Sequence, residues 1–387
     1  MKIQELFNRL WFRLNNRVIH LKPSGKVRGN VLLSYITLPF LNTDPAILNT
    51  HTNRWECLEM AKIFLDLGYA VDVIDFENTS FKPKKSYRYF IDVGTNMERI
   101  GPELGKTCIK IYHATGAYWS FQNKAEEERL LDIQKRKGLK LIPRRLVPAT
   151  HATEVADVIT LIGNEFTKST YSHVDKPIRC IPISTTHLFP SPVNKDIEKA
   201  RKNFIWFGGA GAVHKGLDLV LEAFAAMPEY SLTVYGKPSN EDDFVHAYDK
   251  ELFHTPNIRM NGWVDPASPA FAQTVDHSLA IIYPSCAEGT AGSVVLAMHT
   301  GLIPIVSRET GVDVGDFGML LKANTTEEVQ ASVRSLSSEP YTKLTQRAVD
   351  AWRYAQATYT RPHFETAYRA VIEELESTQP QQLINHA

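Results

Sequence analysis

The chain has 387 residues, 43% of them hydrophobic, and its 43 basic residues are balanced by 43 acidic residues. A net charge of zero provides no overall field for a polyanion, which argues against a nucleic-acid-binding protein. The length fits two domains of about 150–200 residues each. The four cysteines form no close pair, so they predict buried free thiols rather than a zinc site or a disulfide framework.

Residues 3–18 have the pattern of an amphipathic helix. Apolar side chains recur on one face, and Arg9, Arg13 and Arg17 follow each other in four-residue steps on another. Such a helix lies on an anionic membrane surface or docks on the first domain or on a second subunit, and the sequence leaves these alternatives open. Because no signal-peptide core and no long apolar run occur, we expect a cytoplasmic protein, with peripheral membrane contact as the variant.

The first predicted domain alternates strands with helices. Strands are predicted at residues 31–36, 70–76, 89–93, 108–112 and 158–162, and helices at residues 54–67 and 126–137. Strands that are connected through helices predict a parallel sheet. We place this domain at residues 29–183, after a lead-in at residues 1–28.

A proline-rich stretch at residues 181–196 separates this set from a second one, and we place the linker at residues 184–200. The later strands are predicted at residues 204–207, 232–235, 258–262, 279–283 and 303–306, which gives a second domain at residues 201–340. No strand follows the helices of residues 341–387, so we expect these helices to cross back to the first domain. The predicted fold class is α/β, with two Rossmann-like, doubly wound parallel sheets that face a cleft.

The segment FIWFGGAGAVHKGLDLVLEAF (204–224) places glycines and a lysine between a strand and a helix. Gly209 and Gly211 allow backbone amides to approach a ligand, and Lys215 stands just before the helix. This arrangement favours a phosphate group, although a tight turn with a solvated lysine is the simpler interpretation of this loop alone. The spacing matches neither the Walker pattern nor the full dinucleotide fingerprint.

A second loop of the same kind occurs in YPSCAEGTAGSVVLAMHTGLIPIVS (283–307). Glu288 follows a predicted buried strand, at the end of a parallel sheet where ligands bind. Backbone amides that could receive a phosphate belong to Gly289, Thr290, Ala291 and Gly292. Two such loops on one sheet predict a diphosphate site.

Both segments, together with IRMNGWVDPASPAFAQTVDHSLAIIYPSCAEG between them, resemble the donor site of retaining, GT-B-type glycosyltransferases of family four. Weaker matches at residues 156–171, 178–184 and 361–375 extend the resemblance over roughly residues 150–375. It implies transfer of a sugar from a nucleotide-diphosphate sugar to a glycan or glycolipid acceptor, with retention and without a catalytic metal or further cofactor. In this resemblance Lys215 neutralises the leaving phosphate and Glu288 contacts the donor sugar.

Two positions depart from the family pattern. Leu296 stands where the family has a second glutamate that holds the ribose, and Ala210 stands where an arginine accompanies the lysine. These departures leave the nucleotide open. They also leave open a non-catalytic binding or scaffold subunit, and the same fold would serve a nucleotide-sugar epimerase or a phosphorylase.

The first domain is expected to supply the acceptor side. The resemblance implies that His113 lines the cleft near the donor sugar, whereas a buried histidine with backbone partners is the alternative. His51, Asn53 and Arg54 precede a helix and are candidates for contact with an acceptor or a phosphate, with a helix cap as the alternative role. Trp119 belongs to an aromatic cluster that would stack on a sugar ring or fill the core.

The histidines and carboxylates show no spacing that is typical of a metal site. We therefore expect no metal and no nucleic acid among the ligands. The expected ligands are a nucleotide-sugar donor and a saccharide or lipid-linked acceptor.

Overall fold

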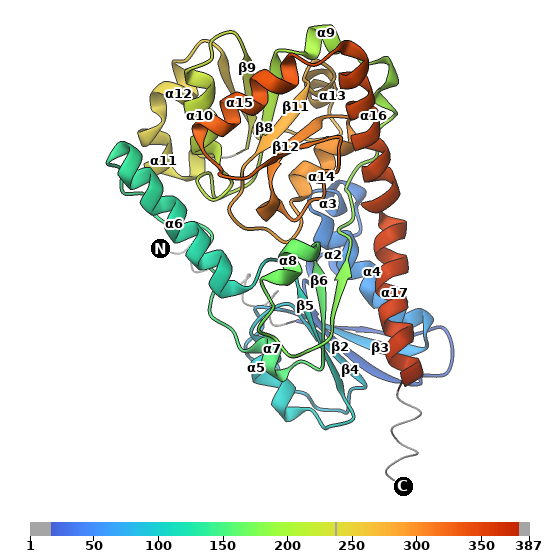
Figure 1. Cartoon of the computed structure of the whole chain (residues 1–387). Helices are drawn as coiled ribbons and strands as arrows, with labels where there is room; N and C mark the ends of the chain where they lie inside the picture. Colours follow the sequence, from blue (N-terminus) through green and yellow to red (C-terminus); the bar gives the residue numbers. More distant parts are fainter. Residues whose placement is uncertain (1–16, 237, 379–387) are drawn as a thin grey trace, which may run out of the picture.

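The computed structural model of the chain describes residues 17–236 and 238–378, which form two α/β domains (Figure 1). The amphipathic helix predicted at residues 3–18 lies almost wholly outside the described residues, and its role stays a prediction.

The first domain contains a seven-stranded sheet. Its strands are β1 (Val18–Leu21), β2 (Gly29–Tyr35), β3 (Tyr69–Asp75), β4 (Tyr89–Asp92), β5 (Ile109–Ala114), β6 (Val158–Ile162) and β7 (Ile178–Ile181), in the order β1-β3-β2-β4-β5-β6-β7. In this sheet only the edge strand β1 is antiparallel to its neighbour, which is β3. The sequence pattern predicted neither β1 nor β7, since both are four-residue strands with little burial.

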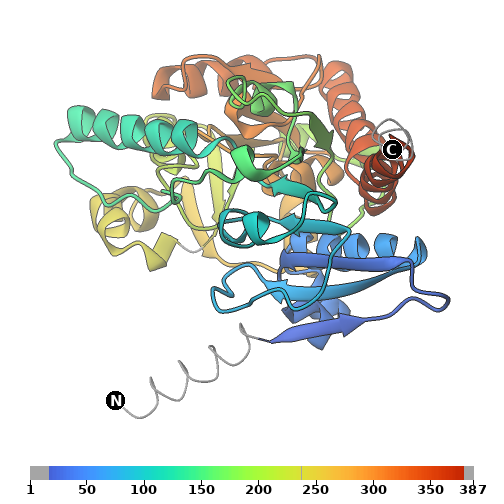
Figure 2. The same ribbon diagram turned by 90° about the horizontal axis from the view of Figure 1, so that it is seen from below.

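The helices of the first domain are α2 (Leu38–Leu41), α3 (Pro45–Leu48), α4 (Thr52–Asp66), α5 (Asn96–Ile100), α6 (Trp119–Lys137), α7 (Ala152–Val155) and α8 (Glu165–Ser169), with a 3-10 turn η1 (Gly101–Glu103). Helix α4 packs its apolar face on β3 and β2. Helix α6 begins seven residues earlier than predicted and leaves the first domain to lie beside the second (Figures 1 and 2). It ends at Gly138, whose φ of 72° is the left-handed conformation that glycine adopts easily.

The second domain contains a six-stranded parallel sheet. Its strands are β8 (Asn203–Phe207), β9 (Ser231–Tyr235), β10 (Ile258–Gly262), β11 (Ala280–Tyr283), β12 (Ile303–Ser307) and β13 (Met319–Leu321), in the order β10-β9-β8-β11-β12-β13. The five longer strands agree closely with the predicted ones, and three of them, β8, β11 and β12, are mostly apolar runs with buried centres. The three-residue β13 was not predicted.

Helices connect these strands. They are α9 (Ile197–Ala200), α10 (Leu217–Ala225), α11 (Asp242–Ala247), α12 (Asp249–Phe253), α13 (Pro269–Asp276), α14 (Gly292–His299) and α15 (Thr326–Ser337), with 3-10 turns η2 (Pro192–Asn194), η3 (Pro238–Asn240) and η4 (Arg308–Thr310). Helix α14 is buried almost all round, between β11 and β12 on one side and α16 on the other.

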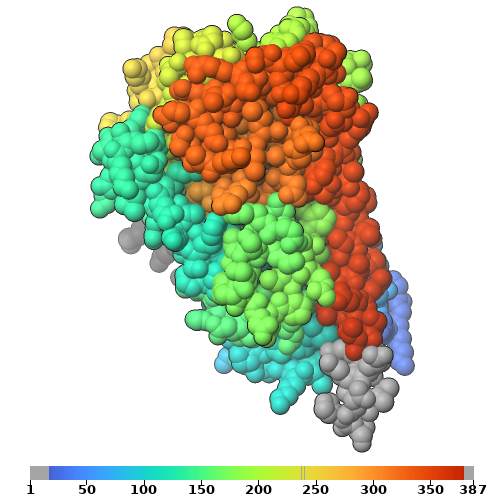
Figure 3. Space-filling view, viewed as in Figure 1, coloured from blue at the N-terminus to red at the C-terminus, as the bar shows by residue number. Residues whose placement is uncertain are grey.

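Two long helices at the end of the chain run along one side of both domains (Figure 3). Helix α16 (Tyr341–Thr358) packs on α14 and β12 of the second domain, and α17 (Arg361–Thr378) packs on α4 and β7 of the first. The α17 carboxylate of Glu376 accepts a hydrogen bond of 2.7 Å from Tyr69, and Arg179 donates one of 2.6 Å to Glu374. These contacts join the end of the chain to the first sheet.

The strand order reverses between β2 and β4 in the first sheet and between β8 and β11 in the second. Such switch points open a crevice beyond the carboxyl ends of the strands, where parallel sheets bind ligands. All four cysteines are free, as predicted, but Cys180 is exposed rather than buried because β7 is an edge strand.

Candidate active site

A cleft of about 1050 Å³ lies between the two domains. It is lined by the residues that follow the strands of both sheets, including Thr115 after β5, Gly208 after β8 and Gly236 after β9. The cleft therefore occupies the position that the two switch points predict for a ligand.

Lys215 and Glu288 meet in this cleft as an ion pair. The ammonium of Lys215 lies 2.7 Å from Oε1 of Glu288, and Lys215 is only 8% exposed. The same Oε1 accepts hydrogen bonds from Ser285 at 3.1 Å and from Tyr283 at 3.4 Å. All of these contacts are made by Oε1, and no hydrogen bond or ion pair engages Oε2 in the part of the chain that the structure describes; Glu288 lines the cleft.

The backbone around Lys215 is fixed by its neighbours. Trp206 donates its indole N–H to the carbonyl of Lys215 at 3.2 Å. Gly216 has a φ of 71°, and a Cβ at this position would lie 2.5 Å from the carbonyl oxygen of Pro284. Glycine is therefore required directly after the lysine, because it lets the loop after β8 contact the loop after β11.

The ion pair fixes the charge of both partners. Burial alone would raise the pKa of Glu288, but the positive charges of Lys215 and His214 lower the pKa to about 2. Burial would lower the pKa of Lys215, whereas the charge of Glu288 raises it above its usual value. Both groups are thus ionised at neutral pH, and Glu288 is too weak a base to take a proton from a sugar hydroxyl.

The structure assigns other partners to two amides that were expected to receive a diphosphate. The amide of Gly211 donates to the carboxylate of Glu241 at 2.6 Å, and the amide of Ala291 donates to the carbonyl of Thr310 at 2.8 Å. Contacts within the protein already satisfy these two donors, and their role in binding a diphosphate stays a prediction. Within the described residues, no hydrogen bond occupies the amides of Gly209 or Thr290, and both residues line the cleft.

Gly289 lies in close contact with the first domain at the cleft. A Cβ on this residue would lie 2.6 Å from the carbonyl oxygens of both Thr115 and Ile162 in the first domain. Its own carbonyl accepts a hydrogen bond of 2.8 Å from Thr167. The glycine expected to bind phosphate therefore also permits contact between the domains, and it lines the cleft together with Gly292.

The two positions at which the resemblance implies a departure from the family pattern both line the cleft. Leu296, on the first turns of α14, lines it and is 6% exposed, so an apolar side chain stands where a ribose-binding carboxylate was expected. Ala210 also lines the cleft and is exposed.

The predicted acceptor residues divide into two groups. His51 and Asn53 line the cleft, and His51 caps α4 because its Nδ1 accepts the amide hydrogen of Asn53 at 3.3 Å. Arg54 donates to the carbonyl of Ile47 and does not line the cleft.

His113 and Trp119 are also not brought to the cleft. His113 is 0% exposed, and its Nδ1 lies 2.8 Å from the hydroxyl of Thr160. It packs edge-on against Tyr35 and Tyr368, and burial lowers its pKa to about 4. The structure thus places His113 in the core, where its periodic burial on β5 directs it, and Trp119 at the start of α6 beside Tyr118.

Two residues of the cleft were missed by the sequence analysis. Glu56 on α4 is buried, accepts the amide of Ser184 at 2.8 Å, and has its pKa raised to about 7 by burial. A carboxyl group of this kind in a cleft is typical of functional sites. Arg145 lies on the segment between α6 and α7 and lines the cleft from the first domain.

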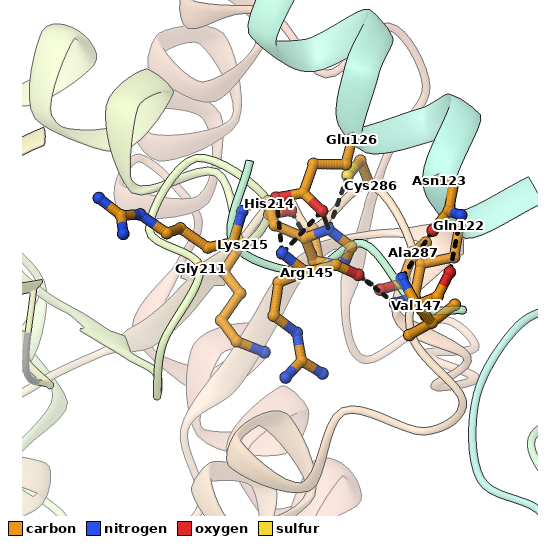
Figure 4. Close-up of polar contacts among 12 residues, drawn as sticks. Gln122, Asn123, Glu126, Arg145, Val147, Gly211, His214, Lys215, Cys286 and Ala287 are labelled. Carbon is orange, nitrogen blue, oxygen red and sulfur yellow. Dashed lines mark hydrogen bonds and ion pairs between the residues drawn. The ribbon is translucent and has the colours of Figure 1, made fainter. Parts of the chain in front are cut away.

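A polar cluster behind Lys215 joins α6 to the second domain (Figure 4). Glu126 on α6 lies 3.7 Å from Nδ1 of His214, and Nε2 of His214 donates to the carbonyl of Ala287 at 2.6 Å. Burial would lower the pKa of His214, but its hydrogen bonds with Cys286 and Glu126 raise the pKa to about 9. His214 is therefore protonated at neutral pH and adds a positive charge behind the ion pair.

The described residues lack two further features, a cluster of metal ligands and a helix that could span a membrane. They contain no group of three or more His, Cys, Asp or Glu side chains arranged to hold a metal ion. None of their helices combines the length and the apolar character that crossing a bilayer requires.

A family comparison identifies the second domain. Residues 201–339 match the family model of the group 1 glycosyl transferases, which covers the loops of Lys215 and Glu288. No curated protein matches the chain in sequence.

Solved structures are similar to both domains. Sucrose-phosphate synthase from Thermosynechococcus elongatus has a TM-score of 0.62 at 12% identity, and the match covers 90% of this chain and 99% of that one. Anabaena HepE, solved in complex with UDP and glucose, has a TM-score of 0.54 at 12% identity, with 90% and 99% covered. TarM from S. aureus has a TM-score of 0.52 at 11% identity with 72% of this chain covered, and this chain spans about half, 54%, of TarM.

These similarities confirm the predicted fold class. The two parallel sheets and the cleft between them correspond to the arrangement of the glycosyltransferases that the chain resembles. Residues 201–339 therefore match the model of a group 1 glycosyltransferase domain, and the chain as a whole has the GT-B fold.

Proposed function

We propose that the protein transfers a sugar from a nucleotide-diphosphate sugar to a glycan or glycolipid acceptor, with retention of the anomeric configuration and without a catalytic metal. The observation that carries this proposal is the buried pair of Lys215 and Glu288 in the cleft at the switch point of the second sheet. The family match of the second domain and the UDP bound by HepE support a nucleotide donor.

The donor diphosphate would lie beside Lys215. When the bond between the anomeric carbon and the diphosphate oxygen breaks, negative charge grows on that oxygen. The ammonium of Lys215 carries three hydrogens, one of which it donates to Glu288, so two remain for phosphate oxygens. A fixed cation in a cleft that excludes much of the water stabilises this charge. The free amides of Gly209 and Thr290 would add hydrogen bonds to the same group.

Glu288 would hold the donor sugar through Oε2. Its low pKa keeps it ionised, so it accepts hydrogen bonds from sugar hydroxyls and does not compete for the acceptor proton. The acceptor would enter from the first domain, past His51, Asn53 and Glu56. Its oxygen bonds to the anomeric carbon, and its proton leaves with the departing diphosphate or with solvent.

The test is a transfer and hydrolysis assay with UDP-, GDP- and ADP-sugars in the presence of EDTA. We expect turnover of one donor class, and a decrease of about 100- to 1000-fold in Lys215→Ala and in Glu288→Gln. The control is Lys343→Ala, which removes another lysine paired with a carboxylate, at 2.8 Å from Glu339, but on the exposed side of α16.

The anomeric configuration of the product, read by NMR, tests retention separately. An inverted product would contradict only that part of the proposal. A folded protein that binds a donor and turns over none would favour the binding or scaffold subunit, and Leu296 would then be the first position to examine.

A further inference from the structure

A segment of the first domain is fastened onto the second domain beside the donor site. This segment, residues 138–151, follows α6 and is here called the α6 loop. The amide of Ile142 donates to Asp243 at 2.8 Å, and Arg144 forms an ion pair with the same carboxylate. The α6 loop is therefore held from the second domain as well as from its own.

The first domain fixes the backbone of the α6 loop at Arg145. Glu126 accepts the amide of Arg144 at 2.6 Å and the amide of Arg145 at 2.8 Å, and Gln122 donates to the carbonyl of Arg145 at 2.6 Å (Figure 4). Because Glu126 also lies beside the protonated His214, these hydrogen bonds link the position of Arg145 to the loop that carries Lys215.

The side chain of Arg145 crosses to the second domain and packs on its glycine loop. A Cβ on Gly211 would lie 2.5 Å from Cγ of Arg145, so this glycine, with its φ of 90°, makes the space for the arginine. Figure 4 shows the guanidinium group of Arg145 and the ammonium of Lys215 pointing in the same direction. Arg145 is exposed and lines the cleft.

The positive charge of Arg145 acts on the donor site, and within the described residues no carboxylate pairs with this arginine. It lowers the pKa values of Lys215 and Glu288 by its positive charge. In the described part of the chain, no hydrogen bond or ion pair engages its guanidinium group. Two cations that converge on one cleft are stabilised by a ligand with more than one negative charge.

Among the described residues that line the cleft, Arg145 and Lys215 are the only arginine or lysine side chains. We propose that Arg145 is the second cation of the donor diphosphate site and that the first domain delivers it across the cleft. This inference rests on the proposed function and specifies its site. The guanidinium group would bind the phosphate oxygens beside Lys215, with a planar pair of donors that suits phosphate.

Calorimetric titration with UDP, GDP and ADP, and with the matching monophosphates, tests this inference. For the nucleotide that the wild-type protein binds, Arg145→Ala should weaken diphosphate binding about 10- to 100-fold and monophosphate binding less than about threefold. Lys140→Ala removes an exposed cation from the α6 loop that does not line the cleft, and its diphosphate affinity should stay within about threefold of wild type.

A rescue variant separates binding from loop structure. Ala210 is exposed at the same rim, so Arg145→Ala combined with Ala210→Arg should regain most of the lost diphosphate affinity. If Arg145→Ala binds the diphosphate as well as wild type does, or loses both nucleotides equally, the inference is overturned and the proposed function is untouched. If the folded wild-type protein binds no nucleoside diphosphate, both fail.

Discussion

Removing the positive charge of Lys215 should destabilise the second domain as well as stop the reaction. In Lys215→Met, Glu288 keeps its burial and loses the largest cause of its low pKa. Breaking a buried ion pair on one side costs about 3–5 kcal/mol, because a charge is left without a partner. The double variant Lys215→Met with Glu288→Gln removes both charges and should recover most of this loss.

The magnitude follows from the pKa of Glu288. A carboxyl group with a pKa of about 2 in the folded protein and 4.5 when unfolded contributes about 3 kcal/mol of stability at pH 7. Because the folded-state pKa is the lower one, this contribution is present above pH 4.5 and is lost as the pH falls from 4.5 to 2. Glu288→Gln should therefore remove that part of the acid destabilisation.

Guanidinium denaturation followed by tryptophan fluorescence measures these free energies of unfolding for the four proteins of the cycle. We expect a coupling energy of at least about 2 kcal/mol between the two positions. A Lys215→Met variant that unfolds within about 1 kcal/mol of wild type, with a double variant no more stable than it, would refute the buried charged pair.

Three further perturbations test other parts of the cleft. Because burial raises the pKa of Glu56 to about 7, the free energy of unfolding of wild type should fall by up to about 3 kcal/mol as the pH rises from 4.5 to 7. The free energy of unfolding of Glu56→Gln should fall much less, and equal pH profiles of unfolding would contradict this. Glu126→Gln removes a partner of His214, whose pKa should fall from about 9 in an NMR titration, and an unchanged value would show that the carboxylate does not act on the imidazole. Gly289→Ala places a Cβ 2.6 Å from the carbonyl oxygen of Ile162, so small-angle scattering should show the domains farther apart and diphosphate binding should weaken about tenfold. An unaltered scattering curve and affinity would argue against the tight contact.

The sequence pattern predicts the longer strands of both sheets because they alternate with helices, whereas the short strands β1, β7 and β13 carry too few residues for a pattern. β8 and β11 were placed within one or two residues, and each precedes a loop whose composition already indicates a ligand. Lys215 and Glu288 are 73 residues apart, yet they were assigned to one site because parallel strands present their following loops at one edge of the sheet.

The partners of individual groups were not predictable in this way. The carboxylate that occupies the amide of Gly211 comes from Glu241, in a segment without a periodic pattern. Arg145 likewise lies in an irregular loop of the other domain, and only the packing of α6 against the second domain brings it to Lys215. His113 was assigned to the cleft although its place on β5 directs its side chain into the core. Contacts of this kind depend on tertiary packing, which local sequence patterns do not predict.

The central claim is that the cleft beside Lys215 and Glu288 binds the diphosphate of a nucleotide sugar. Calorimetric titration of the wild-type protein with UDP, GDP and ADP in the presence of EDTA tests it most directly. The account predicts that one of these nucleotides binds with micromolar affinity, about −7 to −8 kcal/mol, and that Lys215→Ala abolishes the binding. A folded protein that binds none of the three, or a Lys215→Ala variant that binds as tightly as wild type, would contradict it.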